Sequence, residues 1–171
     1  MPLGENGQIV QDRYHYVGED GPIPERVPVI VPAQRFLADT DTLIRRDGSL
    51  GVLWPNDRRI AELAPWLGHL ALVALQFPKF RDGRAYSQAR LLRETYGFRG
   101  TLRATGDVLR DQFSFLARAG FDSFEVKKQA DAEAFTQTVK RYSVFYQPTG
   151  DGRITALHRR MQLRHSEGVG T

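Results

Sequence analysis

The sequence predicts an α/β domain with a mainly parallel sheet built from about five βα units. Apolar and β-branched segments of strand length alternate with segments of helical periodicity, and glycine, proline or aspartate separates one from the next. A complete eight-unit barrel usually needs about 250 residues, whereas this chain has 171. We therefore expect an open, doubly wound sheet, and an incomplete, TIM-like half-barrel is the alternative.

The α/β domain is expected to span residues 27–147. Residues 1–26 come before it, and we expect them to form a peripheral hairpin, or edge strands, and a loop, because glycines and prolines surround the run 8–17. In the first unit, residues 27–31 are a β-branched strand and Pro32 opens a helix. The side chains that this helix would bury are Phe36, Leu37, Leu43 and Ile44.

The second and third units follow the same pattern. Residues 51–54 form a strand, and a helix capped at Asn56 or Asp57 should end near Pro65. Its buried side chains would be Ile60, Leu63 and Ala64. Residues 70–77 are apolar except for Gln76, as expected of a strand covered on both faces. The helix after it has inward positions at Ala85, Ala89, Leu92 and Tyr96 and ends at Gly97.

The fourth unit begins with an alternating strand at residues 101–105. Leu102 and Ala104 share one face of this strand, so Arg103 points to the other. Asp107 should then cap a helix. The apolar positions of that helix are Leu109, Phe113 and Leu116.

The fifth unit closes the predicted domain. It has a strand at residues 123–126 and a helix at residues 131–142, and a last strand is expected at residues 143–147. Residues 148–171 are rich in glycine and arginine, and we expect them to form a flexible basic tail.

Composition narrows the class of function. The chain has no cysteine, which excludes disulfides, thiolate nucleophiles, Cys-ligated zinc and thiolate-held iron–sulfur clusters. The longest apolar run, residues 70–75, is too short to span a bilayer, and the N-terminus has no signal-peptide pattern, so we expect a cytoplasmic protein with no membrane partner. The absence of an aromatic–basic RNA motif and of a recognition helix argues against a nucleic-acid partner.

The sequence shows no catalytic or metal-binding motif. Ser87 lacks the G-x-S-x-G elbow, and no G-x-G-x-x-G fingerprint for a dinucleotide is present. The histidines have no metal-ligand spacing, so no metal site is expected. They are His15, His69, His158 and His165. Whether the chain is an enzyme therefore stays open, and so does the identity of any cofactor.

Positive charge is concentrated in one part of the chain. The net charge is +4, and residues 76–112 alone carry eight Lys or Arg against four Asp or Glu. In parallel α/β folds, ligands bind where strands end and helices begin. Residues 78–83 and 106–112 are two such loops, and we predict that they form one anion- or partner-binding surface. The candidate residues are Lys79, Arg81, Arg84, Tyr86, Arg103, Asp107, Arg110 and Gln112.

Each candidate also has a structural interpretation. Asp82 and Asp107 are more readily helix caps than functional carboxylates. Tyr86 is at a spacing that more often indicates packing than ligand contact. An ion-pair network could instead join Arg103, Arg110, Asp107 and Asp111.

Three segments carry a resemblance to a known family. They are residues 77–93 (FPKFRDGRAYSQARLLR), residues 106–112 (GDVLRDQ) and residues 120–125 (GFDSFE). Over about residues 25–147 the chain resembles an uncharacterised proteobacterial family that is usually encoded beside sulfite reductase in cysteine-biosynthesis gene clusters. That family is commonly described as an oxidoreductase involved in sulfite reduction. The resemblance implies a role in sulfur assimilation and supplies no catalytic residues.

Two hypotheses arise from these observations. In the first, an accessory protein of assimilatory sulfite reduction binds a partner such as sulfite reductase through the basic loops. In the second, an enzyme or ligand-binding protein holds a small anion there, for instance sulfite, sulfate, a phosphate ester or the phosphate of a flavin. A homodimer is compatible with the apolar helix faces.

Overall fold

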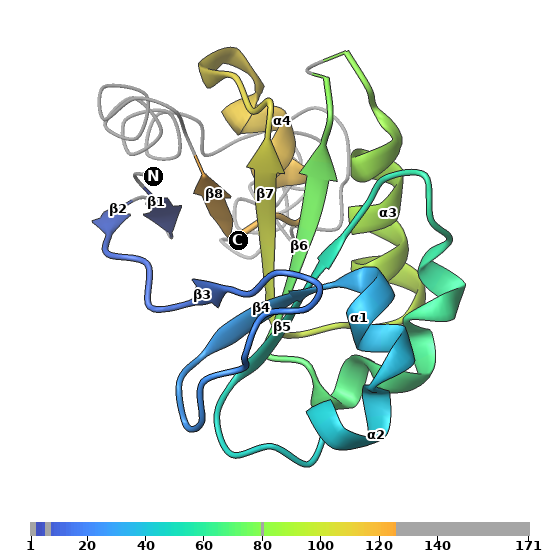
Figure 1. Ribbon diagram of the computed structural model, residues 1–171. Helices are drawn as coiled ribbons and strands as arrows, with labels where there is room; N and C mark the ends of the chain where they lie inside the picture. The colour runs from blue at the N-terminus through green and yellow to red at the C-terminus, as the bar shows by residue number, and fades with distance from the viewer. Residues whose placement is uncertain (1–2, 6–7, 80, 126–171) are drawn as a thin grey trace, which may run out of the picture.

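The computed structural model describes residues 3–5, 8–79 and 81–125, which form one curled sheet with short helices (Figure 1). The strands are β1 (Leu3–Glu5), β2 (Gln8–Val10), β3 (His15–Tyr16), β4 (Val29–Pro32), β5 (Leu50–Trp54), β6 (Leu72–Phe77), β7 (Thr101–Gly106) and β8 (Ser123–Glu125). The helical elements are α1 (Ala33–Ala38), α2 (Thr40–Leu43), η1 (Ile60–Glu62), η2 (Ala64–His69), α3 (Arg84–Arg90), η3 (Leu91–Thr95), η4 (Arg110–Gln112) and α4 (Phe113–Arg118).

The order of the strands defines the architecture. In the described ranges, the eight strands lie in the order β2-β1-β8-β7-β6-β5-β4-β3. Neighbours from β3 to β8 are parallel, whereas β1 is antiparallel to both β2 and β8. The mainly parallel α/β class is therefore confirmed. The doubly wound arrangement is wrong, because the strands from β3 to β8 follow chain order without a reversal, and the sheet curls into a half-barrel.

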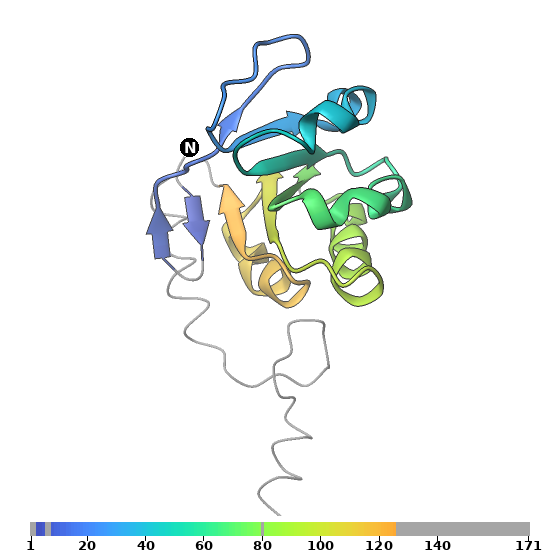
Figure 2. The same cartoon turned by 90° about the horizontal axis from the view of Figure 1, so that it is seen from below.

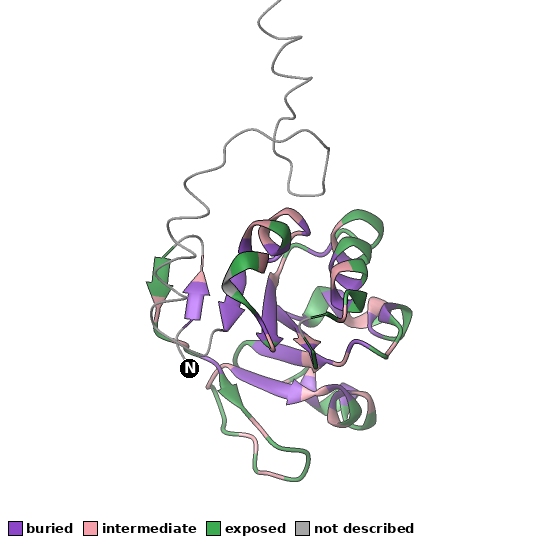
Figure 3. Cartoon of the chain, turned by 90° about the horizontal axis from the view of Figure 1, so that it is seen from above, coloured by how far each residue is buried: buried purple, intermediate pink, exposed green. Residues whose placement is uncertain are grey.

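The helical elements lie on the outer, convex face of the curl (Figures 1 and 2). The large core lies between this face and the helices, and strand residues that face it, such as Val52, Trp54 and Val73, are fully buried. Figure 3 shows that burial is concentrated in the strands and on the inward sides of the helices. No helix of the described part is long and apolar enough to cross a bilayer.

The helices differ from the predictions more than the strands do. The helix expected after Pro32 is two short helices, α1 and α2. The break follows Ala38, where the buried Thr40 hydroxyl donates to the Phe36 carbonyl at 2.6 Å. The α-helix expected before Pro65 is instead the 3₁₀ pair η1 and η2, and Pro65 lies in the first turn of η2.

Two later helices also depart from regular periodicity. A π turn, η3, ends the helix after β6 and turns Tyr96 outward, so that 38% of this residue is exposed. After β7, a 3₁₀ turn precedes α4, and the N-cap of α4 is Gln112 rather than the predicted Asp107. Leu109, predicted to be buried, is 37% exposed. The helix expected at 131–142, the strand at 143–147 and the tail at 148–171 lie outside the described residues.

The inner face of the curl is divided between apolar and polar halves. Over β4 to β6 it carries Ile30, Leu53, Leu72 and Ala74, which pack with Tyr14. Over β7 and β8 it carries polar side chains, namely Arg103, Thr105, Ser123 and Glu125. Residues 11–17, here called the N-terminal strap, follow β2, include β3 and run along the open side of the curl (Figure 2). The first 26 residues, expected at the periphery, thus supply three strands and this strap.

Candidate binding rim at the carboxyl ends of the strands

The two predicted loops lie side by side. Phe77 and Gly106, the last residues of β6 and β7, are register partners, and the Asp107 backbone N–H donates to the Phe77 carbonyl at 2.8 Å. Gly106 has φ +95°, and a Cβ there would lie 2.4 Å from the Phe77 oxygen, so this close approach requires glycine. Residues 78–79, 81–83 and 106–112 therefore form one surface, here called the rim.

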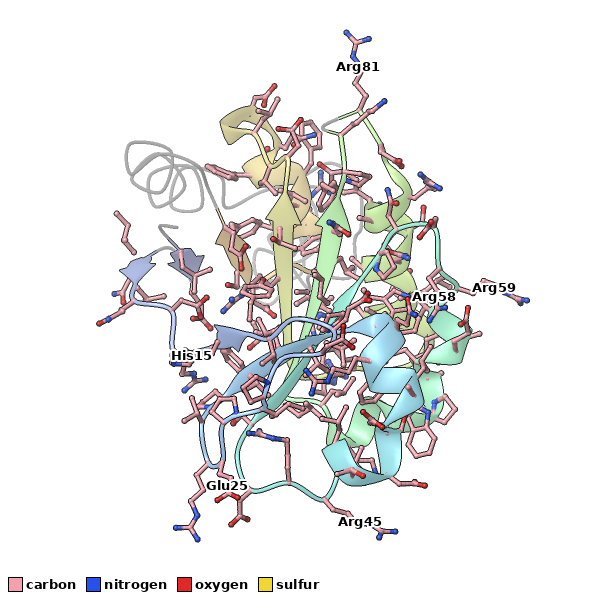
Figure 4. The ribbon with its side chains drawn as sticks, in the orientation of Figure 1. His15, Glu25, Arg45, Arg58, Arg59 and Arg81 are labelled. Carbon is pink, nitrogen blue, oxygen red and sulfur yellow. The ribbon has the colours of Figure 1, made fainter. Side chains whose placement is uncertain are left out.

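Two cationic side chains of the rim are exposed. Lys79 and Arg81 both lie on the loop between β6 and α3 and are exposed to solvent. Arg81 points away from the body of the protein (Figure 4). A rigid central strand, β6, holds the base of this loop, because its neighbours β5 and β7 pair with it on both sides. The rim thus presents positive charge from a well-supported position.

The third predicted cation of this loop, Arg84, is paired within the protein. Its Nε and Nη2 donate to the Asp82 carboxylate at 2.9 and 2.6 Å, and its backbone N–H donates to the same carboxylate at 3.2 Å. These hydrogen bonds hold the pKa of Asp82 well below its usual range. Arg84 therefore neutralises the only carboxylate of the described loop residues, 78–79 and 81–83. Asp82 was expected to cap the following helix, but the N-cap of α3 is Gly83, and Asp82 instead pairs with Arg84.

Tyr86 is a packing residue. Its ring meets Phe77 edge to face at a centroid distance of 5.4 Å, and Phe121 at 6.5 Å. Burial raises the pKa of Tyr86 to about 12, and the negative charge of Asp111 adds to the shift. The hydroxyl is therefore protonated at neutral pH.

The second loop supplies mainly backbone and capping interactions. Gln112 accepts a hydrogen bond from the Leu109 N–H through its Oε1 at 3.2 Å, which closes the turn before α4. Asp107 contributes its backbone N–H to the contact with Phe77. Arg110 lies in η4, and its side chain lies outside the described part of the structure.

Arg103 lies inside the curl, away from the rim. It is 2% exposed, and its Nη1 and Nη2 donate to the Asp12 carboxylate at 2.7 and 2.9 Å. Nη1 also donates to Glu125 Oε1 at 3.1 Å. The predicted pairing of Arg103 with Asp107 or Asp111 is wrong, because the inner face of β7 directs the guanidinium toward the N-terminal strap and β8.

A polar network, buried at its Arg103, Thr105 and Glu125 members, therefore fastens the strap to the sheet. Glu125 accepts hydrogen bonds from the Tyr16 hydroxyl at 2.5 Å and from the Thr105 hydroxyl at 2.6 Å, in addition to Arg103. Burial, followed by the charge of Glu125, raises the pKa of Tyr16 above its usual value. In the sequence, polar residues at 103 and 105, and again at 123 and 125, alternate with apolar residues, and this alternation indicated part of the network. No local pattern indicated Asp12 or Tyr16.

The positive excess of residues 76–112 is partly structural. Besides Arg84 and Arg103, Arg93 donates to the carbonyls of Phe98, Gly100 and Gly120 and pairs with Asp122. It thereby ties the end of the third unit to the start of β8. Three of the eight cations thus make hydrogen bonds that hold the fold together, and Lys79 and Arg81 are exposed on the loop after β6. Among the described residues, no group of His, Asp or Glu is arranged to hold a metal ion.

The geometry defines an α/β half-barrel with a basic loop at the carboxyl ends of its strands. The chain belongs to a bacterial family described as proteins of unknown function (DUF934), whose members it matches over residues 51–157. This range begins in β5 and contains the rim. No curated protein and no solved structure matched the chain.

Proposed function

We propose that this chain is an accessory protein of assimilatory sulfite reduction that binds an acidic surface of a partner, with sulfite reductase as the first candidate. The observation that carries the proposal is the rim itself. Its two loops are joined at Phe77 and Asp107, and its exposed cations, Lys79 and Arg81, stand on a loop whose own carboxylate is neutralised. The pathway comes from the resemblance of residues 77–93, 106–112 and 120–125 described above.

The chemistry of the rim suits a protein surface better than a small anion. The start of α3 would be the natural place for an anion, but the Asp82 carboxylate already accepts the Arg84 N–H there and binds the guanidinium as well. An incoming anion would have to displace this carboxylate. Exposed cations at the edge of an interface, by contrast, mainly accelerate association with a surface of opposite charge.

The test is a binding measurement with immobilised sulfite reductase and the full chain. The variant Lys79→Ala/Arg81→Ala removes the exposed charge of the rim. The matched control is Arg45→Ala/Arg99→Ala, which removes the same charge from two exposed positions that precede the strands β5 and β7, at the other end of the sheet.

We expect the association rate of the rim variant to fall about tenfold and that of the control to stay near the unmodified value. Raising the salt concentration should lower the association rate of the unmodified chain toward that of the rim variant, because salt screens exposed charges. A reductase that does not bind the unmodified chain, or an equal loss in the control variant, would overturn the proposal. Far-UV circular dichroism checks that both variants are folded.

A further inference from the structure

A cavity of about 320 Å³ lies under the N-terminal strap, at the end of the sheet opposite the rim. Its wall includes the first residues of β6 and β7, Leu72 and Thr101, and it is closed by β1, β2 and the strap. Ligand cavities in proteins commonly have volumes from about 300 Å³ upward. This cavity is separate from the proposed partner surface and has its own polar groups.

Three polar side chains form a row across the strands beside this cavity. Glu5 in β1 is the register partner of Ser123 in β8, and Ser123 is the register partner of Arg103 in β7. Cross-strand partners point to the same face of a sheet, so the three side chains share the inner face. Within the described part of the chain, the buried Ser123 Oγ and Arg103 Nε have no hydrogen-bond partner.

The hydrogen bonds that Arg103 donates to Asp12 and Glu125 leave one edge of its guanidinium without a carboxylate. Of the five N–H groups of an arginine, both on Nη1 and one on Nη2 donate to Asp12 and Glu125. The two that remain are Nε–H and the second hydrogen of Nη2, which lie on the same edge of the planar group. Such an edge fits the two oxygens of a carboxylate, and Arg103 lines the cavity.

The charges around the cavity restrict what could occupy that edge. Arg103 already faces two carboxylates, Asp12 and Glu125, and a third, half-buried carboxylate, Glu5, lines the cavity. Arg13 also lines the cavity, so two arginines face three carboxylates, and a simple anion would add negative charge to a group that is already net negative. A zwitterion adds no net charge, since its carboxylate could bind the open edge of Arg103 while its ammonium group binds Glu5.

We propose that the cavity under the strap binds a free amino acid with an apolar side chain. The carboxylate accepts hydrogen bonds from Arg103, and the ammonium group pairs with Glu5, and both of these residues line the cavity. The apolar wall for the side chain consists of Leu3, Val10 and Leu72. The buried Arg103 Nε, which lacks a hydrogen-bond partner in the described structure, would then be satisfied.

The test is calorimetric titration of the full chain with L-leucine. Isoamylamine, which lacks the carboxylate of leucine, and isocaproate, which lacks the ammonium group, serve as matched probes. Because a hydrogen bond to a charged group contributes about 1.5–3 kcal/mol, each analogue should bind at least about tenfold more weakly than leucine.

The protein variants complete the test. Glu5→Gln should weaken leucine binding about tenfold or more while leaving isocaproate unaffected. Glu25→Gln, at an exposed carboxylate on a loop away from the cavity (Figure 4), should leave leucine binding unchanged. The proposal is overturned if leucine, valine and methionine all fail to bind at millimolar concentration. It is also overturned if isocaproate binds as tightly as leucine, or if Glu5→Gln has no effect.

Discussion

Replacement of Arg103 by methionine should destabilise the fold by about 3 kcal/mol. Breaking a buried ion pair by removing one partner costs about 3–5 kcal/mol. The lower value applies here because the Asp12 side chain is 23% exposed and can reach water. Glu125, which is 4% exposed, keeps its hydrogen bonds from Tyr16 and Thr105. For a chain of this length, such a loss corresponds to a decrease in Tm of about 6–12 °C.

The assay is thermal and urea unfolding followed by circular dichroism, for Arg103→Met, Asp12→Asn and the double variant. Residues in direct contact show non-additive effects. The double variant should therefore be more stable than the sum of the two single losses implies, by about 1–3 kcal/mol. A loss below about 1 kcal/mol for Arg103→Met, or strict additivity in the cycle, would refute the conclusion that this ion pair fastens the strap to the sheet.

Two further predictions concern the rim and its supporting residues. Gly106→Ala should lower the free energy of unfolding by about 2 kcal/mol or more, because a Cβ there would lie 2.4 Å from the Phe77 oxygen. Gly97→Ala is also at positive φ but has nothing within 4 Å, so it should lower the free energy of unfolding by about 1 kcal/mol, measured by urea unfolding. Equal losses in the two variants would contradict the close contact between β6 and β7. Tyr86 should ionise near pH 12 in the folded protein, measured as the difference in ultraviolet absorbance between the unmodified chain and Tyr86→Phe. Because the pKa of Tyr86 is raised in the folded protein, the contribution of Tyr86 to stability is complete below about pH 10 and is lost as the pH rises toward 12. A change in absorbance centred near pH 10 would instead show that the Tyr86 ring is not buried.

The strands were predictable because their signal is local. The apolar run 70–75, most of which lies in β6, and the alternation in β7 both indicate burial directly, and the structure has these strands within two residues of the predicted bounds. The adjacency of the two rim loops followed from the same reasoning, because neighbouring parallel strands end at the same edge of a sheet.

The helices and the inner network were not predictable from local patterns. The π turn η3 changes the spacing after α3, so a regular helical period assigns Tyr96 to the wrong side. The pairing of Arg103 with Asp12 joins positions 91 residues apart. It depends on the curl of the sheet, which brings the strap over β7, and a sequence pattern shows alternation along a strand but not how far a sheet curls.

Hydrogen–deuterium exchange of the full chain, with and without sulfite reductase, tests the central claim about the rim most directly. The proposed docking predicts slower exchange in the amides of residues 79–83 and 106–112 when the reductase is present, with little change in β1, β2 and α1. Protection confined to the strap, the β1–β2 hairpin or the α1 region, with the rim unchanged, would contradict it.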